Sequence, residues 1–185
     1  MDDGMMNGKI KLLRPSMDYA EDIMDFRREF LLHDEKEDMG GAGNLRDCQS
    51  AGEWIRFTES MRDAQTCPAG LVDSDIYIAV REKDNKIVGI TEFRHHINHP
   101  VLGLWGGHIG YCVRPCERRK GYGREILRLN LINCREAGLD KVMITCSEEN
   151  IASEKTIRAN GGVYEKTVWS PELKTYMKRF WAALT

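Results

Sequence analysis

The segment GHIGYCVRPCERRKGYG, residues 107–123, decides how the rest of the chain folds. Its first half predicts a β-strand over residues 107–114, because Pro115 has no N–H to donate to a sheet and therefore ends the strand. Its second half is a basic loop with two glycines, Gly121 and Gly123. At a glycine, backbone can approach a ligand with no Cβ in the way.

A helix is predicted over residues 121–137, directly after the basic loop. Leu127, Leu131 and Cys134 recur at the spacing of one helical face, and Gly138 is a common C-terminal signal. The free N–H groups at the start of a helix, together with its dipole, favour an anion. Strand, loop and helix therefore predict an anion-binding site.

The charge of the segment supports this interpretation. Six basic residues lie close together: Arg114, Arg118, Arg119, Lys120, Arg124 and Arg128. Only Glu117 and Glu125 oppose them, although the chain as a whole has a net charge of -2. A solvated charged face is the alternative. The glycine spacing fits neither G-x-x-x-x-G-K-[ST] nor G-x-G-x-x-G, so a phosphate site outside these two nucleotide-binding loops is predicted.

Arg118-x-x-Gly121-x-Gly123 resembles the [QR]-x-x-G-x-[GA] signature of the GNAT acyltransferases. The segments CSEENIASEKTIRANGG (146–162) and KRFW (178–181) extend the resemblance to a subgroup of bacterial GNAT acetyltransferases without a known substrate. The resemblance implies that the loop holds the pyrophosphate of acetyl-coenzyme A (acetyl-CoA). It implies a cofactor site made of these residues: Val113, Arg118, Arg119, Lys120, Gly121, Tyr122, Gly123, Arg124, Asn150 and Ser153.

The catalytic groups are less clearly marked. Many GNAT enzymes carry a tyrosine as general acid seven residues after the asparagine that matches Asn150, and this chain has Ile157 there. An aliphatic side chain has no proton to give, so another group must fill the role or it is absent. For the general base, which takes the proton of the amine, the candidates are Glu92, then His108, then His95. Each could instead be structural, and an amine that arrives neutral needs no dedicated base.

The remaining sequence predicts a single α/β domain over residues 9–185 after a flexible tail at 1–8. Periodicity and turn signals predict seven strands, at 9–14, 75–82, 86–96, 107–114, 142–147, 163–169 and 175–184. Helices are predicted from a cap at Ser16 to about 34, from a capping box at Ser50 and Glu53, over 121–137, and within 149–160. This order predicts a GNAT-like mixed, mainly antiparallel sheet with a central βαβ unit.

Composition excludes several classes of protein. No apolar run approaches the roughly 20 residues of a membrane span, and the acidic start MDDGMMNGK has no signal-peptide core. Six cysteines form no C-x-x-C pair, as expected for thiols in a reducing cytoplasm. Near-zero net charge argues against nucleic acid. A zinc site at His108, Cys112 and Cys116 is rejected, because strand spacing separates the first two Cα atoms by about 13 Å.

The leading hypothesis is therefore a cytoplasmic N-acetyltransferase that moves an acetyl group from acetyl-CoA to a primary amine by direct attack in a ternary complex. A small-molecule acceptor is favoured over a protein, and acidic residues after the first helix (Asp34, Glu35, Glu37 and Asp38) favour a cationic amine. Ile157 supports the alternative of a catalytically degenerate acyl-CoA-binding module. The aromatic run at 179–181 is either core or the edge of a homodimer.

Overall fold

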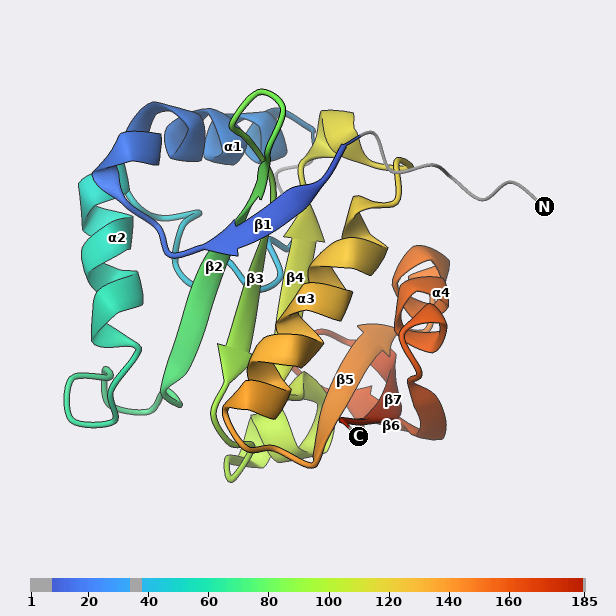
Figure 1. Ribbon diagram of the computed structural model, residues 1–185. Helices are drawn as coiled ribbons and strands as arrows, with labels where there is room; N and C mark the ends of the chain where they lie inside the picture. Colours follow the sequence, from blue (N-terminus) through green and yellow to red (C-terminus); the bar gives the residue numbers. More distant parts are fainter. Residues whose placement is uncertain (1–7, 34–37, 185) are drawn as a thin grey trace.

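A computed structural model describes residues 8–33 and 38–184 of the chain (Figure 1). The predicted tail, except for Gly8, and the acidic residues Asp34, Glu35 and Glu37 lie outside the described residues. The described chain forms one seven-stranded sheet in the order β1-β2-β3-β4-β5-β7-β6. The strands are β1 (Ile10–Leu13), β2 (Ser74–Arg81), β3 (Lys86–Arg94), β4 (Ile109–Val113), β5 (Lys141–Ser147), β6 (Val163–Ser170) and β7 (Thr175–Ala183).

Only β4 and β5 pair in parallel within the described sheet, and a helix, α3 (Tyr122–Glu136), connects them. Every other neighbouring pair in this sheet is antiparallel. The predicted mixed sheet with a central βαβ unit is confirmed.

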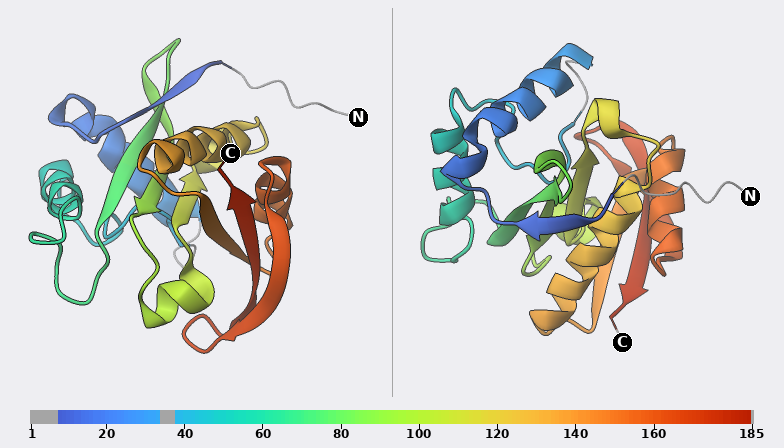
Figure 2. Two further views of the ribbon diagram at one scale, coloured as in Figure 1. Left: turned by 60° about the horizontal axis from the view of Figure 1, so that its bottom comes forward. Right: turned by 45° about the horizontal axis from the view of Figure 1, so that its top comes forward.

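Helices cover both faces of the sheet (Figures 1 and 2). Besides α3, they are α1 (Ala20–His33), α2 (Ala51–Ser60) and α4 (Ile151–Ala159). The helices α1 and α2 pack on one face through Phe26, Phe30 and Trp54, all fully buried. The helices α3 and α4 pack on the other face, where Leu127 and Ile157 are fully buried. None of the helices in the described ranges is long and apolar enough to cross a membrane.

The two predicted helix starts differ in outcome. The cap at Ser50 is confirmed, because its hydroxyl accepts from the Glu53 amide at 3.2 Å, while the Glu53 carboxylate reaches one residue further back than in a standard capping box and accepts from the Gln49 amide at 2.8 Å. The cap at Ser16 is wrong: a 3-10 turn precedes α1, and the Ser16 hydroxyl donates to Asp18 at 3.5 Å instead.

The sheet opens between β4 and β5. These strands share a single residue pair, Ile109 with Ile144, whereas β4 pairs with β3 along its whole length. Residues 108 and 114 form backbone hydrogen bonds with β3, so the alternating pattern directs the amides and carbonyls of Tyr111 and Val113 towards β5. Beyond Ile109, that side of β4 therefore faces a gap between the strands.

A π-helical turn at Leu102–Gly106 precedes β4, where the sequence predicted only a polar loop and a strand that starts at 107. The turn is held to β5, because the Thr145 hydroxyl donates to the Trp105 carbonyl at 2.7 Å. Its wider winding is typical of functional sites. The strand consequently begins two residues later than predicted, at Ile109.

Candidate active site

The basic loop lies between the end of β4 and the start of α3. Arg119 and Gly121 both adopt left-handed backbone conformations, with φ of 64° and 82°. Gly121 is the residue before the first turn of α3, and having no side chain it cannot cap the amides of that turn. Those N–H groups, at the positive end of a 15-residue helix, are available to an anion.

Gly123 is a glycine that the fold does not require. It lies in the first turn of α3, and its φ is not in the left-handed region. An added Cβ would meet Val113, Thr156 and Tyr111 at 3.5 to 3.9 Å, which is ordinary van der Waals contact. A ligand that approaches this turn would explain the glycine, and the residues present therefore fit an acyl-CoA phosphate.

The basic cluster is smaller than the sequence suggests. Arg114 is buried and binds two carboxylates of α1, Asp22 at 2.6 Å and Glu29 at 2.8 Å. Including Arg114 in the predicted anion site was wrong, because the carboxylates of Asp22 and Glu29 already balance its charge. Arg128 pairs with Glu125 on its own helix at 2.7 Å.

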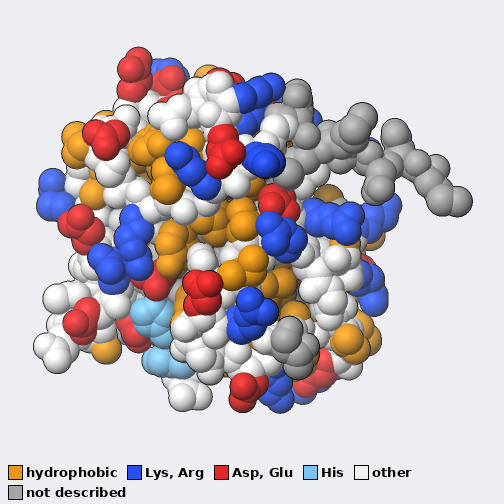
Figure 3. Space-filling model, in the orientation of Figure 1, with side chains coloured by type: hydrophobic (Ala, Val, Ile, Leu, Met, Phe, Trp, Pro, Cys, Tyr) orange, Lys and Arg blue, Asp and Glu red, His pale blue; other side chains and the backbone are white. Residues whose placement is uncertain are grey.

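Two further loop cations contact the protein itself. The Arg118 guanidinium donates to the Val113 carbonyl at 3.2 Å, and Lys120 binds the buried Glu117 at 3.0 Å. Arg119 and Arg124 are exposed and form no ion pair within residues 8–33 and 38–184. Among the described side chains on the face shown in Figure 3, basic and acidic groups alternate.

Tyr122, another predicted cofactor residue, turns its side chain away from the loop. The ring is buried against β1 and β3, and its hydroxyl accepts from Arg81 at 3.2 Å. Only its backbone N–H can serve an anion at the helix start. Tyr122 could therefore contribute to a cofactor site only through its backbone, not through its side chain.

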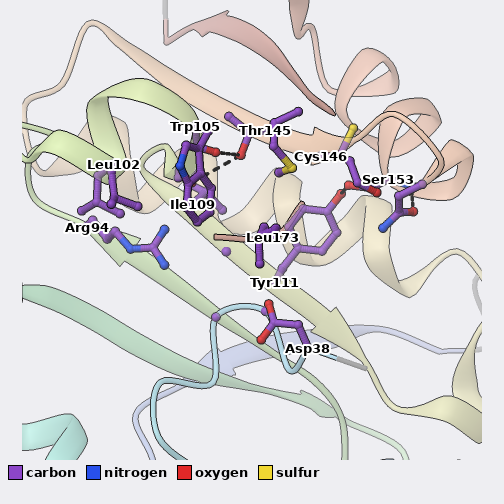
Figure 4. A pocket seen from close by; sticks show the side chains of 18 residues that line it. Asp38, Arg94, Leu102, Trp105, Ile109, Tyr111, Thr145, Cys146, Ser153 and Leu173 are labelled. Atoms are coloured by element: carbon purple, nitrogen blue, oxygen red, sulfur yellow. Dashed lines mark hydrogen bonds between the residues drawn. The ribbon is translucent and has the colours of Figure 1, made fainter. Parts of the chain in front are cut away.

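A cavity of about 530 Å³ continues from the gap between β4 and β5 (Figure 4). Its walls come from β4, β5, the start of α4, the π-helical turn, the β6–β7 hairpin and the loop after α1. Asn150 and Ser153 line it, and the Asn150 side chain caps α4 by accepting from the Ser153 amide at 2.9 Å. The predicted helix within 149–160 is confirmed with Asn150 as its cap, and the ligand role of these two residues stays a prediction.

Tyr111 is a site residue that sequence reasoning missed. Its ring reaches across the gap from β4 to α4, where its hydroxyl lies 2.9 Å from the Ser153 hydroxyl (Figure 4). Ser153 is one helical turn before Ile157, so the phenol meets the same face of α4 on which the family tyrosine stands. Ile157 itself is fully buried in the core. Burial raises the pKa of Tyr111 to about 12, so its phenol stays protonated at neutral pH.

Cys146 is the thiol among the described residues that line the cavity. Burial raises the pKa of Cys146 to about 11, with the Glu154 carboxylate adding to the effect. A thiol with this pKa is protonated at neutral pH and is a poor nucleophile.

The predicted bases do not line the cavity. Glu92 is buried on β3, where the Ser74 hydroxyl donates to it at 2.8 Å and Arg94 binds it at 2.7 Å. His108 accepts from the Met143 amide through Nδ1 at 2.9 Å, and burial lowers its pKa to about 4. A neutral imidazole has one acceptor nitrogen, and the backbone already uses it, so this geometry weighs against His108 as the base.

His95, the third candidate, lies after β3 between two carboxylates, Asp73 and Asp75. The hydrogen bond to Asp75, opposed by burial, raises the pKa of His95. Although burial opposes the change, hydrogen bonds from His95 and Arg14 lower the pKa of Asp75 to about 2. His95 is thus part of a surface ion-pair network outside the cavity lining.

We expect His95→Gln to destabilise the protein more at pH 6 than at pH 9. Because the folded-state pKa of His95 is raised, its stabilising effect is complete below its unfolded pKa and is lost as the pH rises through the folded value. Thermal unfolding should show a deficit of about 2–4 °C at the lower pH, equivalent to about 1 kcal/mol. An equal loss of melting temperature at both pH values would contradict a raised pKa of His95 in the folded protein.

Comparisons with known proteins agree with the fold. The family model "Acetyltransferase (GNAT) domain" matches residues 12–163. No curated protein matches the chain.

Solved structures with similar folds include three acetyltransferases. The microcin C7 self-immunity acetyltransferase MccE, in complex with acetyl-CoA and AMP, has 18% identity and a TM-score of 0.70 over 96% of this chain and 94% of its own. The ribosomal-protein-S5-alanine acetyltransferase from Vibrio fischeri has 16% identity and a TM-score of 0.68 over 94% and 91%. A point mutant of the spermidine N-acetyltransferase SpeG from Vibrio cholerae has 14% identity and a TM-score of 0.60 over 95% of each chain. At these identities the likeness concerns the fold.

Proposed function

The chain belongs to the GNAT acetyltransferase family, and we propose that it transfers an acetyl group from acetyl-CoA to a primary amine by direct attack in a ternary complex. The observation that carries the proposal is the uncapped start of α3 beside the gap between β4 and β5. Residues 9–185 would form the catalytic domain.

Two parts of the chain would bind acetyl-CoA. The amides of residues 121–124 and the exposed Arg119 and Arg124 would hold the pyrophosphate. The backbone of Val113 that faces the gap, together with Asn150 at the start of α4, would hydrogen-bond the pantetheine arm. Acetyl-CoA supplies the activated thioester.

The transfer forms a C–N bond and breaks the C–S bond of the thioester. The amine loses one proton, and the leaving thiolate takes up another. We assign the second proton to the Tyr111 hydroxyl, held by Ser153 on the cavity wall, in place of the tyrosine that Ile157 replaces. The Tyr111 backbone amide, directed into the gap, would polarise the thioester carbonyl.

Glu92 and His108 stay the predicted bases for the proton that the amine loses, with Glu92 preferred. Both side chains already have partners in the described chain. An amine that enters in its neutral form would lose the proton to water after the attack, and this route needs neither residue.

Direct transfer predicts that Cys146 is dispensable. Since its thiol is protonated at neutral pH, an acetyl-cysteine intermediate is disfavoured. We expect Cys146→Ala to keep kcat within about threefold of the parent, because no covalent step passes through the sulfur. Steady-state thiol release at saturating acetyl-CoA measures this. A loss of about 100-fold or more, with unchanged acetyl-CoA binding, would favour a covalent route.

The alternative is a binding module that senses acyl-CoA without turnover, and the fully buried Ile157 favours it. Calorimetric titration with acetyl-CoA tests the binding half of the proposal, and thiol release with a panel of amines tests turnover. Micromolar binding with turnover supports the enzyme. Binding without thiol release from any amine supports the module, and absence of binding by the folded protein rejects both.

A small-molecule acceptor is proposed rather than a protein, nucleic acid or membrane, because a cavity of about 530 Å³ lined by several of the chain's own segments offers room for a small amine. A cytoplasmic location and a homodimer are also proposed, and both rest on the sequence alone.

A further inference from the structure

The cavity holds charges of opposite sign on different walls. Among the described residues that line it, the charged side chains are Arg94, from the end of β3, and Asp38, from the loop after α1. Figure 4 shows the two side chains pointing into the cavity from different elements. A ligand with one negative and one positive group would match this arrangement.

The Arg94 guanidinium is held in place by buried neighbours. It binds Glu92 at 2.7 Å and donates to the Gly107 carbonyl at 3.2 Å. Glu92 in turn accepts from the Ser74 hydroxyl, and both Glu92 and Ser74 are buried. Glu92 balances the charge of Arg94, but a guanidinium has five N–H donors, so these two contacts leave donors for a ligand carboxylate in the cavity. Glu92 therefore has a clear structural role as the residue that positions Arg94.

Two glycines fix the loop that carries Asp38. Gly41 has a left-handed φ of 78°, and a Cβ there would lie 2.3 Å from the Gly110 carbonyl oxygen. A Cβ on Gly110 would lie 2.7 Å from the Gly41 nitrogen. Loop and strand can touch only because both positions are glycine. This contact holds the loop against β4, and Asp38 on the same loop lines the cavity.

One wall of the cavity is largely apolar. Its side chains come from the π-helical turn and the β6–β7 hairpin: Val101, Leu102, Trp105, Leu173 and Met177. This wall could receive a hydrocarbon side chain.

We propose that the acceptor is an apolar α-amino acid, and this inference rests on the proposed acetyltransferase function. Its carboxylate binds Arg94, its amino group lies towards Asp38 and the thioester, and its side chain packs on the apolar wall. Arg94 is then the residue that selects the acceptor, and Glu92 is its positioning residue. A planar fork of donors suits a carboxylate.

The test compares amines that differ only in the carboxylate: L-leucine with 3-methylbutylamine, and L-phenylalanine with 2-phenylethylamine. For the parent we expect kcat/KM from thiol release to be at least about tenfold higher for each amino acid. Arg94→Gln should bring the ratio close to one by weakening only the amino acids. Arg128→Gln, which removes an exposed arginine paired on α3, should leave the ratio unchanged.

Calorimetry gives a second readout that does not require turnover. L-leucine titrated into CoA-saturated protein should bind the parent, and Arg94→Gln should weaken this binding about tenfold or more. Glu92→Gln should raise KM for the amino acids, because the amide no longer holds the Arg94 guanidinium in an ion pair. A fall in kcat with a shifted pH profile would instead identify Glu92 as the base.

The possible failures are separable. Turnover of the decarboxylated amines or polyamines in preference to amino acids would overturn the acceptor class and leave the acetyltransferase proposal standing. Acetyl-CoA binding with neither binding nor turnover of the amino acids would also overturn it. Lack of acetyl-CoA binding by folded protein would reject the proposed function itself.

Discussion

Gly123→Val is expected to weaken acetyl-CoA binding about 100-fold while leaving the fold intact. The expected loss corresponds to about two charge-assisted hydrogen bonds between helix amides and phosphate. The structure leaves room at this position, since the nearest atom to an added Cβ is 3.5 Å away. A larger side chain would occupy the space in front of the α3 amides that the ligand needs. Isothermal titration calorimetry gives the affinity.

Gly123→Ala is the matched control, because the family signature accepts alanine at this position. Alanine should bind acetyl-CoA like the parent, and should raise the melting temperature slightly because it favours a helix over glycine. The valine variant should unfold within about 3 °C of the parent. If the valine variant and the parent bound acetyl-CoA equally well, the start of α3 would not be part of the cofactor site.

Tyr111→Phe is expected to lower kcat about 100-fold, within the range that general acids contribute. The change removes the hydroxyl that lies 2.9 Å from Ser153 and keeps the ring that packs between β4 and α3. Acetyl-CoA affinity should therefore stay within about threefold, since no phosphate contact is lost. Single-turnover thiol release separates this effect from product release.

The pH profile gives a sharper check. With the pKa of Tyr111 raised to about 12, its phenol is protonated throughout the stable range, and it should add no basic limb below about pH 10. Tyr176→Phe, which removes an exposed hydroxyl on β7, is the control and should keep full activity. A Tyr111→Phe enzyme with parental single-turnover rates would exclude the phenol as the acid.

Local sequence signals predicted the fold well. The cap at Ser50 and the proline that ends the central strand act within a few residues, so their effects can be read without the tertiary structure. The order of elements followed from periodicity in the same way. The π-helical turn was missed, because a five-residue stretch carries too little periodicity to distinguish it from a loop.

Features of the site that depend on distant contacts could not be predicted. Arg114 was counted as a free cation because its partners, Asp22 and Glu29, are 92 and 85 residues away in the sequence. Tyr111 was overlooked although it lies two residues before Val113 and so shares its orientation, which was the available signal. The register between β2 and β3 places Ser74 beside Glu92, and sequence alone does not give register.

The single residue pair between β4 and β5 also bears on how the domain holds together. With Ile109 and Ile144 as the shared pair, the sheet consists of two ladders, β1–β4 and β5–β7–β6, joined by α3, the core beneath it, and the hydrogen bonds of the π-helical turn and His108 to β5. Each ladder can form a cooperative unit that opens on its own, at a lower free energy than global unfolding. The catalytic cavity lies on the boundary between these units. A substrate bound across this boundary would couple their stabilities, so that cofactor occupancy and folding cooperativity rise together.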